Sequence, residues 1–519
     1  MLAFILGIEA IVVSVYADGA ALASKPGIVT RFVGEHGAWI VKGLIGFGAL
    51  FAIFVLLAYR SGLALLAGEI AATSINARWF SLHFAAIALF GVLSRALYAD
   101  SSGGFPPDVI AVAWIGAAFA VVSTVGLAVA PCNIWSRLIR GTRKLIVSAF
   151  AASALACFAG AMSWNLWGST SRLTFTLVRF ILGFFVTNIV VQPWAMRVGT
   201  HRFTVVISEQ CSGLEGAALI LIFGLFWLVL CRKDLRFPQA IALVPAGVAI
   251  LFLLNAVRIA ALILIGHAGA REIATRGFHS QAGWIAFNCV AFAFAIASRH
   301  LPWFTVAPRH HVAEFAAAPY LAPFLAILAA GMISRASSGI FEWPYGLRVL
   351  AALAALWFFR KRFTEVDWRT GWPGPLTGVV VFAFWIGFDR VSGAAMPSAL
   401  AAATPTLRNA WIALRVIGAV LTVPIAEELA FRGFLLRRLV SADFENVAWR
   451  NFTMFALLAS SVLFGLMHGD RWLAGTLAGL CYAGVSLRTG RLGEAIAAHA
   501  TTNALIAIYV LCFGHWYFW

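Results

Sequence analysis

Charged residues are scarce in this chain, and their scarcity excludes most classes of soluble protein. Only 11% of the 519 residues are Asp, Glu, Lys or Arg, whereas 62% are hydrophobic and the mean hydropathy is +0.90. Soluble domains carry about 25% charged and about 45–50% apolar residues. The composition therefore predicts a membrane protein and excludes ordinary soluble, disordered and collagen-like chains.

The apolar residues form long continuous runs rather than the alternating pattern of membrane strands, so a β-barrel is disfavoured. Since a spanning helix needs about 20 apolar residues, the runs predict an all-α polytopic membrane protein with roughly 14–16 transmembrane helices in two helical-bundle domains. A stretch that combines proline, histidine and charge separates the domains. The expected parts are N-terminal membrane segments of unknown role at 1–80, a first domain at 81–300, a linker at 301–318 and a second domain at 319–519.

Acidic residues are few: 21 Asp and Glu stand against 38 Lys and Arg, a formal net charge of +17. In a soluble protein this excess would indicate nucleic-acid binding. Here the basic residues gather in short segments between apolar runs, as they do in cytoplasmic loops under the positive-inside rule. We therefore expect the lipid bilayer, and no nucleic acid, as their partner. The segments are 137–144, 232–236, 360–362 and 437–438.

Cysteine is also infrequent, with seven residues and no C-x-x-C spacing. An odd number without such spacing predicts neither a disulfide framework nor a zinc-finger site. No basic segment precedes the first apolar stretch, 2–16, and no cleavage site follows it. We therefore expect this stretch to be a retained membrane segment rather than a removed signal peptide.

Three reactive side chains stand at the ends of apolar runs in the first half. Cys211 precedes one run, Arg258 lies late in the next, and His279 precedes the third. The basic segment 232–236, between the first and second runs, is expected in the cytoplasm. All three side chains are therefore expected at the outer face of the membrane.

The basic segment 137–144 conflicts with this orientation. If it is also cytoplasmic, full spans at 145–167 and 174–195 would return the chain to the cytoplasm before Cys211. We therefore expect one of these runs, in particular the one that carries Arg179, to be re-entrant or broken.

The chemistry of the first group suits a thiol acyl-transferase. Cys211 at a helix N-terminus would favour the thiolate, which attacks a peptide carbonyl and forms a thioester. His279 would manage the protons, and Arg258 would stabilise the oxyanion or align the substrate. The alternative is a buried cysteine, an arginine that reaches the interface and a loop histidine without catalytic roles.

Three motifs in the first half resemble those of the exosortase/archaeosortase family. They read Cys211-Ser-Gly, Asn255-x-x-Arg258 and His279-x-x-x-Gly283. The resemblance implies a membrane cysteine transpeptidase that cleaves C-terminal sorting signals of exported proteins. It also implies that Cys211 is the nucleophile and that Arg258 and His279 complete a triad.

A second group of polar side chains lies in the apolar runs near the C-terminus. Glu428 and Arg432 are four residues apart and can pair on one helical face, while Glu427, about 100° round the helix, stays available. Glu427 would act as general base on a water, with His468 sharing the proton and two further groups donating to the oxyanion. The full set is Glu427, Glu428, Arg432, His468, His499 and Asn503.

Two other interpretations of this group remain open. Buried ion pairs and hydrogen bonds can simply hold helices together. Glu427 with His468 and His499 can also ligate zinc, but the sequence has no H-E-x-x-H motif. We therefore favour metal-free hydrolysis and expect no cofactor.

The motifs E-E-x-x-x-R, F-x-x-x-H and H-x-x-x-N, in this order, resemble the CAAX prenyl endopeptidase and bacteriocin-processing (CPBP) family over about 375–515. This resemblance implies an intramembrane glutamate-type endopeptidase that uses the six residues above. The two halves together resemble the fused exosortase E/protease family, which implies a multi-pass protein of the bacterial inner membrane acting on VPEID-CTERM substrates. The oligomeric state stays open. The alternative is a transporter or channel, which predicts inverted halves, but the halves share no motif.

Overall fold

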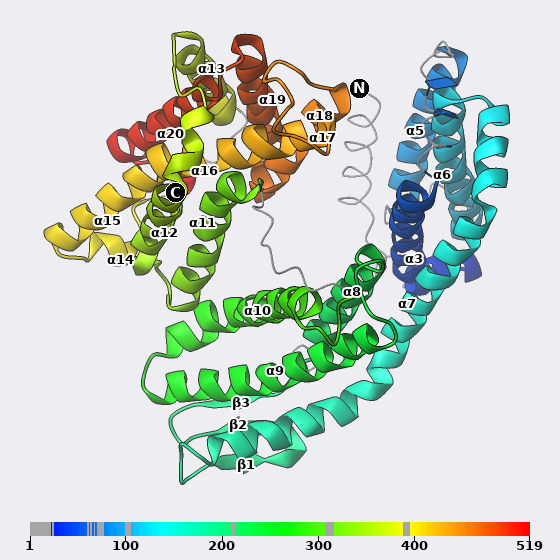
Figure 1. Ribbon diagram of the computed structural model, residues 1–519. Coiled ribbons are helices and arrows are strands. Elements are labelled where there is room, and N and C mark those ends of the chain that lie inside the picture. The colour runs from blue at the N-terminus through cyan, green and yellow to red at the C-terminus, as the bar shows by residue number, and fades with distance from the viewer. Residues whose placement is uncertain are drawn as a thin grey trace. The chain divides into compact units, whose positions relative to one another are not determined.

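The computed structural model describes residues 25–59, 77–98, 105–208, 213–306, 316–387 and 395–519, with a few single positions between 22 and 69. The chain forms two compact units, Met1–Leu166 and Trp167–Trp519, which are described separately below (Figure 1). The domain boundaries expected from the sequence, at residue 80 and at 301–318, stay predictions.

The described residues confirm the predicted fold class, an all-α polytopic membrane protein. They contain seven helices that are long and apolar enough to cross a membrane, and five shorter apolar helices. The count of roughly 14–16 spans stays a prediction. The seven long helices are Arg78–Tyr98, Pro107–Val129, Gln239–His267, Ile273–His300, Ala318–Ala336, Pro405–Val440 and Leu492–Phe513.

The first unit is built from α3 (Ile28–Ala58), α5 (Ala77–Tyr98), α6 (Pro107–Val129) and the first part of α7 (Cys132–Leu182). Asp108, in the first turn of α6, accepts hydrogen bonds from the backbone N–H groups of Ile28, Val29 and Thr30 at 2.9, 2.9 and 3.1 Å. A carboxylate at a helix N-terminus satisfies donors that have no intrahelical partner. This contact therefore ties the start of α3 to α6.

The run 174–195, which carries Arg179, is broken, as the conflict over segment 137–144 led us to expect, and it is not one spanning helix. Instead, α7 continues unbroken to Leu182, and a three-stranded antiparallel sheet follows, in the order β1-β2-β3. Valine and threonine fill much of this sheet because branched side chains suit extended backbone. One helix thus takes the place of the predicted span 145–167 and of the start of 174–195, and the orientation of segment 137–144 stays a prediction. The strands are β1 (Val190–Gln192), β2 (Arg197–Gly199) and β3 (Thr204–Val206).

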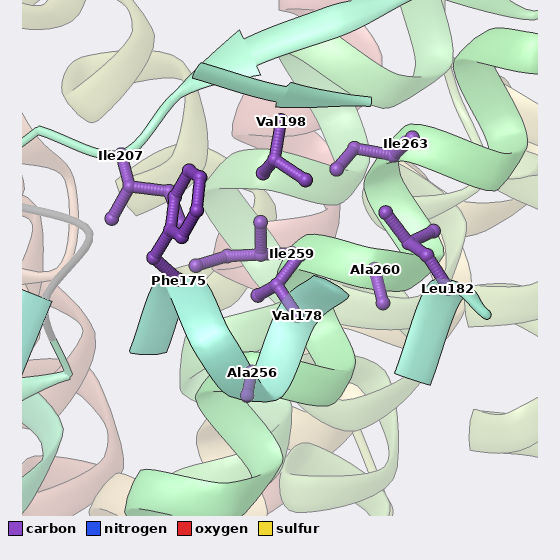
Figure 2. Packing of buried hydrophobic residues seen from close by; sticks show 9 residues of the cluster. All are labelled: Phe175, Val178, Leu182, Val198, Ile207, Ala256, Ile259, Ala260 and Ile263. Atoms are coloured by element: carbon purple, nitrogen blue, oxygen red, sulfur yellow. The ribbon is translucent and has the colours of Figure 1, made fainter. Parts of the chain in front are cut away.

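The sheet and the end of α7 pack on α9 in the second unit (Figure 2). Residues 213–306 of the second unit also contain α8 (Leu214–Leu230), α10 (His279–His300) and the π-helical turn Ile273–Phe278. Val178 and Leu182 of α7 and Ile263 of α9 (Leu243–His267) are all 0% exposed. This apolar core holds in place the helix that carries Arg258.

The rest of the second unit is a helical bundle. One helical path runs from Pro405 to Val440 and contains two π-helical segments, Gly418–Thr422 and Leu429–Leu436. π-helical insertions are frequently found at functional sites because they redirect side chains. The α-helices are α11 (Ala318–Ala336), α12 (Gly346–Phe358), α13 (Pro373–Gly387), α14 (Ser398–Ala401), α15 (Pro405–Ile417), α16 (Val423–Glu428), α17 (Arg437–Val440), α18 (Met454–Leu466), α19 (Trp472–Thr489) and α20 (Leu492–Phe513).

Within the second unit, the π-helical turn Ile273–Phe278 contacts the end of α11 beside His279. Gly277, in the π-helical turn that precedes α10, faces the backbone carbonyls of Arg335 and Ser338 at the end of α11. A methyl group at Gly277 would collide with both oxygens. This close approach therefore depends on a glycine at this position.

Candidate active sites

A cavity of about 570 Å³ lies among α8, α9 and α10, and both Arg258 and His279 line it. Arg258 donates from Nη2 to the His279 carbonyl at 3.2 Å, and the same nitrogen lies 3.3 Å from His279 Nδ1. Its Nη1 donates to Asn255 Oδ1 at 3.2 Å. Helices α9 and α10 thus bring together two of the three residues predicted for the first site.

The contact between Arg258 and His279 restricts the histidine tautomer. A guanidinium can only donate hydrogen bonds, so Nδ1 acts as the acceptor and the ring hydrogen sits on Nε2. In this form His279 is a hydrogen-bond donor to a thiolate or an oxyanion. It can accept a further proton only if Arg258 releases Nδ1.

Cys211 lies outside the described residues, and the chain is described again from Gly213. Gly213 is the N-cap of α8 with φ of 86°, and a Cβ there would lie 3.1 Å from Asn255 Nδ2. Left-handed backbone and this close neighbour favour glycine. Gly283 of the third motif also lies against Arg258, where a Cβ would be 3.5 Å from Nη1. Residues of all three motifs therefore line one cavity.

A second cavity, of about 190 Å³, is lined by four of the six residues predicted for the C-terminal site. They come from α16, from the turn that follows α18 and from α20. The helical bundle thus gathers side chains that are up to 76 positions apart in the sequence, counted from 427 to 503. The four residues are Glu427, His468, His499 and Asn503.

The other two predicted residues form a buried ion pair behind this cavity. Arg432 Nη1 donates to Glu428 at 3.0 Å, and the two residues are 3% and 0% exposed. Arg432 also donates from Nη2 to the Gly479 carbonyl at 2.8 Å. The pairing predicted from their four-residue spacing is confirmed.

His499 completes this buried group. Its Nδ1 lies 2.9 Å from Glu428 Oε1, and its ring stacks on Tyr482 with centroids 4.9 Å apart. An ionised carboxylate only accepts hydrogen bonds, so Nδ1 carries the hydrogen and Nε2 keeps its lone pair. Glu428 therefore sets both the orientation and the tautomer of His499.

His468 and Asn503 each form one side-chain hydrogen bond to a backbone carbonyl. His468 Nδ1 lies 2.9 Å from the Phe464 carbonyl, which can only accept, so the Nε2 of His468 is the basic nitrogen. Asn503 donates from Nδ2 to the Ala419 carbonyl at 2.7 Å, within the first π-helical segment. One of its amide hydrogens is thus engaged with the backbone, and its oxyanion role stays a prediction.

Two family models match the chain. Residues 39–296 match "Transmembrane exosortase (Exosortase_EpsH)", and residues 409–505 match "Type II CAAX prenyl endopeptidase Rce1-like". The chain is an exosortase fused to a CAAX-type protease. Searches of curated proteins and of solved structures found no match.

These matches identify the protein as a multi-pass membrane peptidase. The exosortase match contains Cys211, Arg258 and His279, and it begins at residue 39, within the segment whose role the sequence left unknown. The match to CAAX endopeptidases contains all six residues predicted for the C-terminal site. The catalytic roles of these residues stay predictions.

The alternative metal site does not assemble in this structure. Among the described residues, no three His, Cys, Asp or Glu side chains lie close enough together to hold one metal ion. Glu427, His468 and His499 line a common cavity but do not form such a set. The absence of a metal requirement remains a prediction.

Several residues that line the two cavities were not predicted from the sequence. The CAAX-protease cavity also contains Arg415, Arg471 and Tyr482, and the exosortase cavity also contains Glu215 and Trp284. Arg415 and Glu215 could have been found, because each is an ionisable residue within or beside an apolar run, and such residues usually mark function.

Proposed function

We propose that the exosortase part is a cysteine transpeptidase that cleaves C-terminal sorting signals of exported proteins. Cys211 attacks the peptide carbonyl as a thiolate, the C–N bond breaks, and the leaving amine takes a proton from water; the nucleophile of an acceptor then attacks the thioester carbonyl, gives its proton to the hydroxide that remains and releases the thiolate. Arg258 and the Nε2–H of His279 stabilise the developing negative charge. The observation that carries this proposal is the cavity shared by Arg258, His279 and Gly213.

The proposal includes an orientation in the bacterial inner membrane, with Cys211 on the periplasmic side. Its support is the basic character of segment 232–236, which predicts a cytoplasmic loop, together with the single helix α7 between segment 137–144 and the sheet. A sorting signal of the VPEID-CTERM class, with its basic tail in the cytoplasm, would then present its cleavage site to Cys211.

A reporter protein that ends in a candidate sorting signal tests the transpeptidase. The reporter is expressed with the wild-type enzyme, with Cys211→Ala and with Cys231→Ala, and the products are measured by mass spectrometry. Cys231 is a matched control because it is a free cysteine at the other end of α8. We expect cleavage to persist in the control and to stop in Cys211→Ala. Cleavage by Cys211→Ala at the wild-type rate would exclude the thioester.

For the C-terminal part we propose a glutamate-type intramembrane endopeptidase that degrades the membrane span severed by the exosortase site. Glu427 takes a proton from a water as the water adds to the peptide carbonyl, and returns it to the leaving amine. The Nε2 atoms of His468 and His499 are available to that water and to the tetrahedral intermediate. The supporting observation is that Glu427 and both histidines line one cavity.

The fate of the severed span tests this role. After cleavage of the reporter, the C-terminal remnant is followed by pulse-chase in cells with the wild-type enzyme or with Glu427→Ala. We expect the remnant to persist in Glu427→Ala. If the remnant disappears at the normal rate in this variant, the proposed role is wrong.

A further inference from the structure

The CAAX-protease cavity contains a positive charge that the proposed hydrolysis does not use. Arg415, at the end of α15, lines this cavity together with Glu427 and Arg471. Within the described part of the chain, Arg415 makes one hydrogen bond, from Nη1 to the Tyr345 hydroxyl at 2.9 Å, and no ion pair. Its positive charge therefore faces the cavity with neutral partners only.

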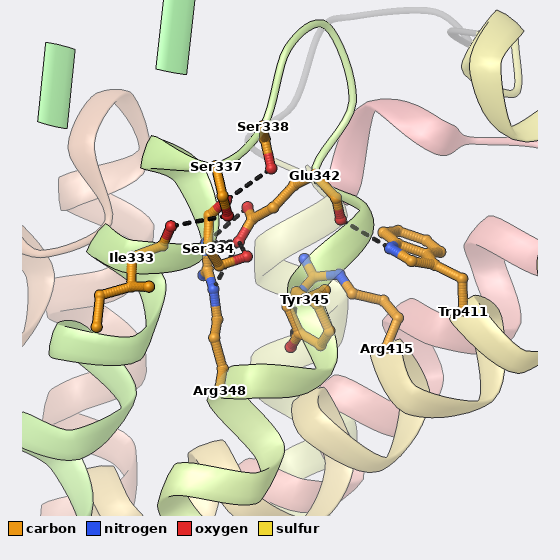
Figure 3. Close-up of polar contacts among 9 residues, drawn as sticks. All are labelled: Ile333, Ser334, Ser337, Ser338, Glu342, Tyr345, Arg348, Trp411 and Arg415. Atoms are coloured by element: carbon orange, nitrogen blue, oxygen red, sulfur yellow. Dashed lines mark hydrogen bonds and ion pairs between the residues drawn. The ribbon is translucent and has the colours of Figure 1, made fainter. Parts of the chain in front are cut away.

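Neighbouring charges are already compensated. Arg348, beside Tyr345, forms an ion pair with Glu342, in which Nη2 of Arg348 donates to both carboxylate oxygens, Oε1 and Oε2, at 2.6 and 2.7 Å (Figure 3). The buried charges of Glu428 and Arg432 likewise compensate each other. Among the described residues, Arg415 thus lines the cavity without an ion pair, and the carboxylate of Glu427 lines the same cavity.

Arg415 is also held in a defined place. Its guanidinium carbon lies 4.8 Å from the centre of the Tyr345 ring, and Tyr345 itself is only 4% exposed. The Tyr345 hydroxyl packs against Gly418, which begins the first π-helical segment. Nearby, Trp411 Nε1 donates to the Glu342 carbonyl at 2.9 Å (Figure 3). The side chain on which Arg415 stacks is thus fixed by buried packing.

The geometry points to a carboxylate-binding subsite: Arg415 binds a carboxylate of the peptide that the Glu427 site cleaves. A fixed guanidinium with unused N–H donors suits a carboxylate, which it can bind through two parallel hydrogen bonds. The carboxylate can be an Asp or Glu side chain or the free C-terminus of the peptide. This inference rests on the proposed function of the C-terminal site and adds its substrate class.

Binding to an inactive protein tests the subsite apart from catalysis. The Glu427→Gln full-length protein is placed in nanodiscs and titrated with four fluorescent peptides. Each peptide has a Leu/Ala-rich span of about 20 residues, carries either Glu or Gln near its C-terminal end, and ends in either a carboxylate or an amide. A charged hydrogen-bonding partner should improve Kd about ten- to hundredfold over its neutral isostere. A difference in Kd between the Glu and Gln peptides identifies a side-chain carboxylate as the ligand. A difference between the peptides that end in a carboxylate and in an amide identifies the free C-terminus.

Two variants in the same background assign the effect to Arg415. Arg415→Met should bring the charged and neutral peptides to equal Kd, whereas Arg408→Met should keep the difference. Arg408 is a matched control because it lies two turns earlier on α15 and outside the cavity. Tyr345→Phe removes only the hydroxyl that positions Arg415, and should reduce the difference severalfold. If Arg415→Met does not fold, the result for Tyr345→Phe shows whether the preference for a carboxylate depends on Arg415.

Equal Kd values for all four peptides, or a difference that survives both Arg415→Met and Tyr345→Phe, would overturn the subsite. A cleavage assay with the wild-type enzyme separates this inference from the proposed function. If Arg415-dependent binding is found but no peptide is cleaved, the protease role fails and the subsite stands. If peptides are cleaved and binding shows no dependence on Arg415, the subsite fails alone.

Discussion

The buried ion pair of the C-terminal site makes the sharpest prediction about its architecture. Glu428 is 0% and Arg432 3% exposed, and His499 makes a further hydrogen bond to the same carboxylate. Glu428→Gln removes the negative charge with little change of shape. Because this leaves a guanidinium buried without a counter-charge, we expect the free energy of unfolding to fall by about 3–5 kcal/mol.

Unfolding by SDS titration, followed by tryptophan fluorescence, measures this loss. The matched control is Glu272→Gln, since Glu272 forms an ion pair with Arg276 at the same four-residue spacing and 2.8 Å, but with side chains 57% and 63% exposed. Exposed pairs contribute about 0–1 kcal/mol. The two substitutions should therefore differ by at least about 2 kcal/mol.

The double variant Glu428→Gln/Arg432→Met completes the test. Replacing a buried pair by uncharged residues is often close to neutral for stability, so the double variant should recover much of the loss. It should still be inactive as a protease, because His499 no longer has the carboxylate that orients it. Equal losses for Glu428→Gln and Glu272→Gln, or no recovery in the double variant, would refute the assignment of the charge pair as the source of stability.

Three further predictions follow from single residues. Gly213→Ala should lower cleavage of a sorting-signal reporter about tenfold or more, because a φ of 86° strains any residue with a Cβ and the new methyl group would push on the Asn255 amide beside the site. Gly277→Ala should cost about 1–3 kcal/mol in SDS unfolding, whereas Gly484→Ala, which has no neighbour within 4 Å, should not destabilise the protein. Hydrogen bonds from Arg369 lower the pKa of Asp367 from 3.8 to about 2, so their contribution is present above about pH 4 and is lost as the pH falls through 2. The unfolding midpoint of Asp367→Asn should then depend less on pH between about 5 and 2 than that of the wild type.

Local spacing correctly predicted one contact in the C-terminal group, the pairing of Glu428 with Arg432, because a helix fixes which side chains meet. A spacing of four residues places Glu428 and Arg432 on one face of an α-helix. Their ion pair forms although the segment between them belongs to the π-helical stretch Leu429–Leu436. The same reasoning did not predict the partner of Asn503. Its amide donates to Ala419 in another π-helical segment, and a π-helical insertion leaves no hydropathy signal.

The small sheet shows a different limit of sequence reasoning. The run 174–195 is apolar enough for a span, but α7 ends at Leu182 and the residues from 190 onward pair as strands. Hydropathy measures how apolar a segment is and does not distinguish a helix in lipid from a strand packed on protein. The branched residues Val190 and Val191 carried the signal, which depends on a packing partner, here α9, that the sequence does not reveal.

Arg432 and Arg415, two arginines of the C-terminal half, differ in how deeply they are buried and in whether a carboxylate pairs with them. Arg432 is almost fully buried, and a guanidinium in that position requires a carboxylate, which Glu428 provides. Arg415 is half-buried and stacked on Tyr345 beside open cavity space, so it remains stable without a carboxylate of its own. A substrate carboxylate that enters the cavity would displace water and meet a guanidinium that forms no ion pair with any described residue. Among the described residues, the buried Arg432 thus has a carboxylate partner, whereas Arg415, which lines the cavity, has none.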